Sequence, residues 1–291
     1  MAEPAIPLID SHAHLQAEAF AADRGEVLAA ARRAGLVRVL VAGWDLASSL
    51  ASVELAGQLD VDASAGIHPH VARQADAATW GRIVELAAHP AVVAVGETGL
   101  DYDRSFAPRD AQLANLRRHL ELGRNLGKPV ILHCRSRPGM RDAQDDLLHE
   151  LAAAGAGSSR WSVGARAIPA LLHSFSGPVD YAEAALSMGL AISFSGLVFR
   201  RGEESSAEVA RLVPGNRLLV ETDAPYLSPP GGPHRRNEPK YVAITLSWLA
   251  AQQTEDEAGL AERLVANYDS FFGRAAATPT ARTPGTPATP T

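Results

Sequence analysis

The stretch Ile6-Pro-Leu-Ile-Asp-Ser-His-Ala-His14 is a short apolar run that ends in two histidines. Comparable runs, rich in Val, Leu and Ile, recur along the chain and alternate with longer amphipathic stretches. We predict strands at residues 6–11, 37–42, 61–66, 92–97, 130–133, 168–173, 190–194 and 218–222. Helical patterns fall between them at residues 24–34, 46–59, 79–89, 109–126, 142–154 and 179–188. This alternation predicts an α/β fold in which helices cover a parallel sheet.

The number of predicted strands, eight, is that of a closed (β/α)₈ TIM barrel, which commonly occupies roughly 250 residues as one domain. Two further helices are predicted at residues 241–252 and 256–272, and the second of them ends at Gly273, a typical helix stop. We therefore expect a single barrel domain with extra C-terminal helices over residues 1–273. A doubly wound open sheet is the alternative architecture.

Two segments differ in composition from the rest of the chain. Residues 274–291 are mostly Ala, Thr and Pro without a large apolar residue, which predicts a disordered tail outside the fold. Residues 155–166 are rich in Gly, Ser and Arg and are expected to form a loop insertion between the fifth helix and the sixth strand. In a barrel, such a loop lies on the face opposite the catalytic rim.

Composition excludes several classes of protein. No apolar block approaches the roughly 18 residues of a membrane span, and the N-terminus does not resemble a secretory signal, so we expect a cytoplasmic protein with no membrane partner. The single cysteine, Cys134, excludes an internal disulfide. The net charge of −6 provides no overall attraction to nucleic acid, so a polyanionic substrate must be held locally by clustered arginines. These clusters are Arg135, Arg137 and Arg141; Arg200 and Arg201; and Arg235 and Arg236.

Six potential metal ligands fall at the ends of predicted strands. They are His12, His14, Glu97, His133, His173 and Asp223. The spacing by two residues directs the rings of His12 and His14 to the same side of a strand. If the sheet closes into a barrel, the carboxyl ends of its strands form one rim, so these six side chains surround one cavity.

The ligand types and their number predict a two-metal hydrolase. Imidazoles suit zinc and related ions, carboxylates suit harder cations, and one catalytic ion needs only about three protein ligands. Two divalent ions can polarise a phosphoryl oxygen and lower the pKa of water to roughly 7. Asp223 is then the candidate to orient that water and accept its proton. His89, His119 and His149 fall in predicted helices and are expected to be solvated, and Cys134 is expected to pack beside His133.

A set of ordered motifs resembles the TatD-type deoxyribonuclease family, a branch of the metal-dependent hydrolases with amidohydrolase-like barrels. They are Asp10-Ser-His-Ala-His-Leu15, Gly66-Ile-His-Pro-His70, Val95-Gly-Glu-Thr-Gly-Leu-Asp-Tyr102, His133-Cys-Arg135, His173-Ser-Phe-Ser-Gly177, Glu221-Thr-Asp-Ala-Pro-Tyr-Leu-Ser-Pro229, Arg236-Asn-Glu-Pro239 and Asn267 to Phe272. The resemblance covers residues 8 to about 273. The loop Gly231-Gly-Pro-His-Arg-Arg236 and the length of the 155–166 segment depart from the family pattern, and neither departure contains a ligand.

The resemblance implies ligand sets and an activity. It places His12, His14, Glu97 and Asp223 around one ion and Glu97, His133 and His173 around another, so that Glu97 bridges and is catalytic together with Asp223. It also implies a magnesium-, manganese- or zinc-dependent deoxyribonuclease that removes nucleotides from nucleic-acid ends, with His68 near the scissile phosphate. Arg135 and Arg236 are the candidates for contacts to neighbouring phosphates.

Two other functions are compatible with these residues. The same barrel and ions can hydrolyse an amide, a lactone or a phosphotriester, since a fold does not determine a reaction. The second hypothesis is a metal-stabilised adaptor that binds protein partners and uses the Thr-Pro tail as a docking segment. Nothing in the sequence implies an obligate protein partner.

Overall fold

Eight parallel strands form the centre of the molecule in a computed structural model, which describes residues 6–158, 161, 169–233 and 235–274. The strands are β1 (Leu8–Ala13), β2 (Leu36–Ala42), β3 (Asp62–Ala65), β4 (Val92–Asp101), β5 (Val130–Arg135), β6 (Ala170–Leu172), β7 (Ala191–Phe194) and β8 (Leu218–Val220). Each strand pairs in parallel with the next along the chain, so sequence order is also spatial order. The predicted barrel is confirmed.

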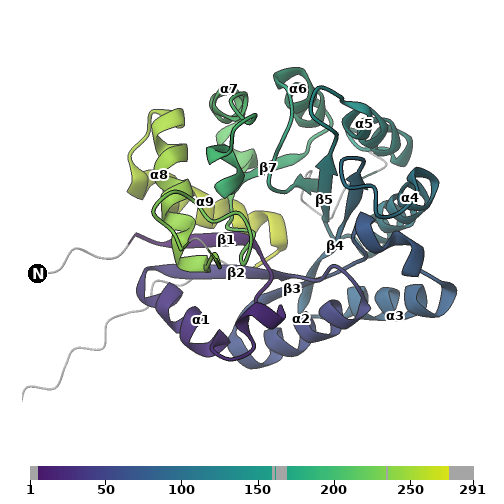
Figure 1. Cartoon of the computed structure of the whole chain (residues 1–291), viewed down its shortest axis with the longest axis horizontal. Helices are drawn as coiled ribbons and strands as arrows, with labels where there is room; N and C mark the ends of the chain where they lie inside the picture. The colour runs from purple at the N-terminus through teal and green to yellow at the C-terminus, as the bar shows by residue number, and fades with distance from the viewer. Residues whose placement is uncertain (1–5, 159–160, 162–168, 234, 275–291) are drawn as a thin grey trace, which may run out of the picture.

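A ring of helices surrounds these strands (Figure 1). The helices are α1 (Arg24–Arg33), α2 (Leu46–Leu59), α3 (Ala77–Ala88), α4 (Arg109–Leu126), α5 (Asp142–Ala154), α6 (Val179–Ser187), α7 (Ser206–Leu212), α8 (Val242–Gln253) and α9 (Glu257–Phe272). Strands β1, β3, β6, β7 and β8 are buried along their whole length, as expected where helices cover the outside and side chains fill the inside of a barrel. No helix in the described ranges is long and apolar enough to cross a membrane.

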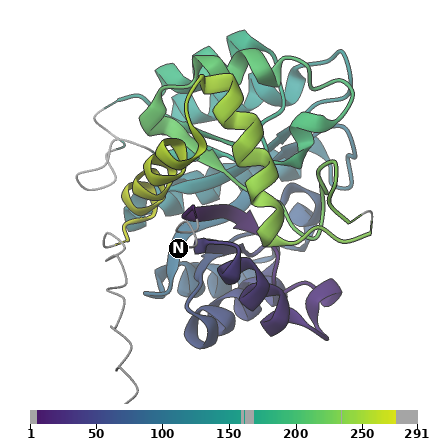
Figure 2. The ribbon, with the colours of Figure 1, turned by 90° about the vertical axis from the view of Figure 1, so that its left-hand side faces the viewer.

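The barrel closes where β8 meets β1. Ser11 Oγ donates a hydrogen bond to Val220 O at 3.1 Å, and the backbone N–H of Asp223 donates to His12 O at 2.9 Å. The backbone N–H and hydroxyl of Thr222 both donate to the buried carboxylate of Asp10, at 2.9 and 2.6 Å. Helices α8 and α9 pack against β1 and β8 and cover this seam from outside (Figure 2).

Strand β4 is longer than its predicted range of 92–97 and continues to Asp101. Gly96 and Gly99 are turn signals in a sequence. Here Gly99, with φ of +137°, instead lets β4 approach β5 so closely that a Cβ would lie 1.9 Å from His133 O. The β4–β5 register shifts between Val95 and Thr98, which places Glu97 at an irregularity of the kind that redirects a side chain next to an active site.

One helix is absent from the prediction. The short helix α7 has only seven residues, too few to establish an apolar period, and it follows the polar stretch 200–205. The predicted start of the sixth strand at Ile168, most of the 155–166 segment and residues 275–291 lie outside the described residues. Arg274, predicted as part of the tail, is described and contacts the fold: its backbone N–H donates to Asp269 O at 2.9 Å.

Candidate metal centre

Four of the predicted ligands form a compact group at the barrel seam. His12 Nε2 lies 3.3 Å from both Glu97 Oε2 and His14 Nε2, and His14 Nε2 lies 3.3 Å from Asp223 Oδ1. Ligand atoms in a tetrahedron, each about 2.1 Å from one ion, are separated by about 3.4 Å. His12, His14 and Glu97 have ligand atoms 3.3 to 3.8 Å apart, so their spacing and chemistry fit one divalent ion, and Asp223 adjoins them through His14.

A second group lies on the other side of Glu97. Glu97 Oε1 is 3.3 Å from His133 Nδ1 and 2.9 Å from His173 Nε2. The two oxygens of the Glu97 carboxylate thus face different groups, Oε2 the first and Oε1 the second. All six predicted ligands lie together in the structure. The Glu97 carboxylate stands between the two groups, where it can bridge an ion in each.

The outward nitrogens of three imidazoles are hydrogen-bond donors. His14 Nδ1 donates to Ala42 O at 2.9 Å, His173 Nδ1 to Glu221 Oε1 at 3.1 Å, and His133 Nε2 to Asp101 Oδ2 at 3.2 Å. A neutral imidazole has one proton, so the inward nitrogen of each ring keeps a lone pair for a metal. Partners of this kind fix the orientation and tautomer of metal-binding histidines.

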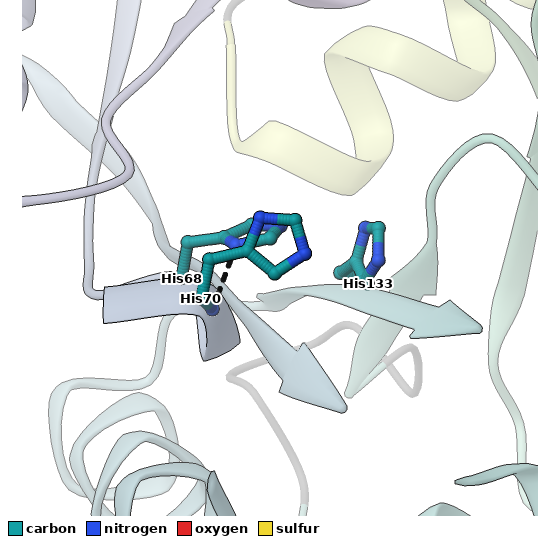
Figure 3. A group of neighbouring side chains, drawn as sticks. All are labelled: His68, His70 and His133. Carbon is teal, nitrogen blue, oxygen red and sulfur yellow. Dashed lines mark hydrogen bonds between the residues drawn. The ribbon is translucent and has the colours of Figure 1, made fainter. Parts of the chain in front are cut away.

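In His68 the protonated nitrogen faces inward instead. Its Nδ1 accepts a hydrogen bond from the backbone N–H of His70 at 3.1 Å, so a neutral ring holds its proton on Nε2, 3.2 Å from Glu97 Oε1. Burial lowers the pKa of His68 to about 4, which keeps the ring neutral at pH 7. Figure 3 shows His68 and His70 on one short helical turn, with His133 facing them from β5. His68 is therefore a hydrogen-bond donor aimed at the centre.

Three residues that support these groups, Asp101, His70 and Glu221, were given no role in the prediction from sequence. Asp101 Oδ2 accepts from His133 and from His70 Nε2 at 2.7 Å, and Glu221 accepts from His173. Asp101 lies four residues after Glu97 on β4, and Glu221 lies two residues before Asp223. Both acids lie close in sequence to a predicted ligand at the same strand end. This proximity is the signal that could have identified Asp101 and Glu221.

The expectation that His119 is solvated is wrong, whereas His89 and His149 are exposed. His119 lies on the inward face of α4, where its Nε2 accepts from the backbone N–H of Ile67 at 3.0 Å. Asn115, one turn earlier, donates from Nδ2 to Ile67 O at 2.6 Å. His119 and Asn115 thus bind the backbone N–H and C=O of Ile67. These two hydrogen bonds position the turn that carries His68 and His70.

The electrostatics favour the ionised carboxylates that metal binding requires. Burial opposes ionisation of Glu97, but interactions with the surrounding imidazoles, those of His68, His173 and His12, outweigh it and hold the pKa of Glu97 well below its usual value. Burial likewise opposes ionisation of Asp223, and its hydrogen bond with His14 lowers its pKa overall. Burial raises the pKa of the Cys134 thiol to about 12, so this half-buried side chain on the cavity wall is protonated at neutral pH.

Five of the six predicted ligands, all except the buried His12, line a cavity of about 530 Å³. Its wall includes Arg135, whose Nε is paired with Asp103 Oδ2 at 3.1 Å. Arg236 is not among the described residues that line this cavity. It forms a bidentate pair with Asp23, at 2.7 and 2.8 Å, and also contacts Glu238 at 3.0 Å.

The comparison with known proteins identifies the family of the chain. The family model of the TatD related DNases matches residues 9–273. The chain belongs to this family. The 3'-5' ssDNA/RNA exonuclease TatD of Escherichia coli (strain K12) is 37% identical over 274 residues, which cover 91% of this chain and 99% of the exonuclease. An uncharacterized metal-dependent hydrolase, YabD of Bacillus subtilis (strain 168), is 33% identical over 244 residues, 84% of this chain and 90% of YabD.

A solved structure extends the likeness to the fold. The crystal structure of YjjV, a TatD homolog from Escherichia coli K12, superposes with a TM-score of 0.79 at 25% identity and covers 94% of this chain and 100% of YjjV. The predicted family, barrel and enzyme class are confirmed: the chain is a metal-dependent hydrolase of the TatD family that acts on ester bonds. These matches do not favour the lactonase, amidase or adaptor alternatives.

Proposed function

We propose that this TatD-family protein is a metal-dependent exonuclease that removes nucleotides from single-stranded DNA ends and holds two divalent ions. The observation that carries the proposal is the division of the Glu97 carboxylate between two ligand groups at one cavity. A 3'-to-5' polarity and activity on RNA follow the name of the Escherichia coli relative.

The donor set defines which residues would hold the ions. His12, His14 and Asp223 form the first site and His133 and His173 the second, with Glu97 common to both. Imidazoles suit zinc and carboxylates suit magnesium and manganese, so the donor set contains ligands suited to each of these ions. Two such ions supply Lewis acidity at a phosphoryl oxygen and an acidified water as nucleophile.

The remaining steps belong to side chains of this chain. Asp223, on the cavity side of the first group, orients the attacking water and accepts its proton. His68 donates from Nε2 to a phosphate oxygen, because its Nδ1 is already occupied as an acceptor. Arg135, on the cavity wall, contacts a neighbouring phosphate. Arg236 can do so only by exchanging the Asp23 carboxylate for phosphate.

A degradation assay tests the proposal. We would incubate the purified protein with manganese and an end-labelled single strand, and with the matching duplex. We expect stepwise shortening of the single strand, slower loss of the duplex, and no turnover by Asp223→Asn. The proposal is wrong if the wild-type protein degrades neither strand nor duplex yet hydrolyses a neutral lactone or amide.

A further inference from the structure

An exposed aromatic side chain stands at the rim of the cavity. Phe106, in the loop between β4 and α4, is 64% exposed and lines the cavity. The exposed large apolar side chains of the described residues include two aromatics, Phe106 and Tyr226, and both line this cavity. Two exposed aromatic side chains that line the same cavity favour a ligand-binding role there.

The loop that presents Phe106 is held in place at several points. The backbone N–H of Tyr102 donates to Arg135 O at 2.8 Å, and that of Arg104 donates to Asp101 Oδ1 at 2.8 Å. Gln112 Nε2 donates to Ala107 O at 2.8 Å. Ser105 adopts a left-handed φ of 51°, a conformation that persists only where neighbouring contacts enforce it. The exposure of Phe106 is thus a property of an organised loop.

Ring contacts join Phe106 to the ligand groups. Its ring packs edge-to-face on His70, with centroids 4.8 Å apart, and the His70 ring lies 6.0 Å from that of His133. His70 is in turn anchored by Asp101 at 2.7 Å. Only the ring of His70 therefore lies between Phe106 and His133, a residue of the second group.

A cation accompanies the aromatic ring. Arg104, two residues earlier in the same loop, also lines the cavity. No carboxylate of the described residues lies within 4.0 Å of its guanidinium, in contrast to Arg135, which is paired with Asp103. An aromatic ring beside an arginine is the combination with which proteins bind single-stranded nucleic acid: the ring stacks on a base and the arginine binds a phosphate.

We propose that Phe106 and Arg104 form a nucleotide subsite, in which an unpaired base next to the scissile phosphate stacks on Phe106 while Arg104 binds an adjoining phosphate. This inference rests on the proposed nuclease function and names the residues that select its substrate. Every base has a stacking face, so the subsite tolerates any sequence. In a duplex the faces of each base are covered by its neighbours, so the subsite favours single strands.

A scan with abasic substrates tests the stacking step. A tetrahydrofuran residue is placed at each position near the degraded end of a labelled strand, and kcat/KM is measured for wild type, Phe106→Ala and Phe106→Trp. We expect about a tenfold loss of kcat/KM for wild type at one position, a typical size for one stacked base. Phe106→Ala should degrade intact and abasic strands at the same low rate, and Phe106→Trp should restore the difference. Leu212→Ala, an exposed apolar side chain on α7, is the matched control and should behave as wild type.

The outcomes separate this inference from the nuclease proposal. If wild type degrades single strands but Phe106→Ala still degrades the abasic strand about tenfold more slowly than the intact strand, the subsite is overturned and the nuclease stands. If wild type degrades no strand, the nuclease proposal itself fails.

A salt series tests the phosphate contact of Arg104. The slope of log(kcat/KM) against the logarithm of salt concentration should be shallower by about 0.7 in Arg104→Gln than in wild type. Arg104→Lys, which keeps the positive charge, should have the wild-type slope. An unchanged slope in Arg104→Gln overturns the phosphate contact.

Discussion

The carboxylate of Glu221 lies 3.1 Å from Nδ1 of His173, on the side of the ring opposite Glu97. Glu221 is fully buried and contacts the ring nitrogen of His173 that does not face Glu97, so its effect is to orient and polarise His173. Loss of such a partner typically lowers metal affinity 10- to 100-fold. We expect Glu221→Ala to weaken binding of the second ion by this amount in calorimetric titrations with manganese or zinc. Glu221→Gln, which keeps an oxygen acceptor, should lose less, and equal affinities for all three proteins would contradict this role.

Glu97 should be required for both ions. Its two oxygens face different ligand groups, so removal leaves each group one anionic donor short. We expect elemental analysis of reconstituted wild type to give two divalent ions per chain and of Glu97→Ala to give fewer than one. Asp223→Ala should retain the second ion, since Asp223 contacts only the first group. A Glu97→Ala protein that still holds two ions would show that the carboxylate does not bridge.

Arg135 and Arg236 should differ in how they affect substrate binding. Arg135 lines the cavity, whereas Arg236 is committed to Asp23 and Glu238. We expect Arg135→Gln to reduce the salt dependence of kcat/KM by about 0.7 in log–log slope, as for one lost phosphate contact. Arg236→Gln should leave the slope unchanged. If both variants lower it equally, Arg236 must leave Asp23 when the strand binds.

The buried His119 should make stability depend on pH. Burial lowers its folded-state pKa to about 3, below the value of about 6.5 in an unfolded chain, so the unfolded state binds the proton first. The contribution of His119 to stability is therefore complete above pH 6.5 and falls as the pH drops toward 3. We expect the free energy of unfolding in urea to fall between pH 6.5 and 5 more steeply for wild type than for His119→Gln, by up to about 1.4 kcal/mol per pH unit. Parallel pH profiles would contradict this account.

Arg274 should mark the end of the fold. Its Nε lies 3.2 Å from Oδ1 of Asp62, a buried carboxylate that also accepts from the Tyr268 hydroxyl at 2.8 Å. We expect truncation after Arg274 to leave Tm and activity unchanged, because residues 275–291 lack large apolar side chains. Truncation after Gly273 should lower Tm by roughly 2–4 °C, as for a loss of about 1 kcal/mol. A large drop in Tm after the shorter truncation would show that the tail docks.

Strand periodicity was enough to predict the barrel, and the strand-end residues were enough to predict which six side chains lie together at its rim, because both depend on local pattern and on the shared rim of parallel strands. The length of β4 could not be predicted in this way. In the sequence alone, Gly99 indicates a turn. Only the position of β5 shows that this glycine allows β4 and β5 to pair closely. His119 was misjudged for a related reason: its partner is the backbone of Ile67, on a different element. The commitment of Arg236 to Asp23 likewise joins segments more than 200 residues apart.

The seam between β1 and β8 has a consequence for the newly made chain. The first ligand group is built from the first strand of the barrel and from Asp223, which follows the last, and Asp223 is tied to β1 by its own backbone hydrogen bond to His12. A ribosome-bound chain that has not yet released β8 therefore holds the whole second group but lacks Asp223 of the first. The catalytic centre is completed only when the two ends of the barrel meet, so nuclease activity arises late in synthesis, after nearly the whole domain has left the ribosome.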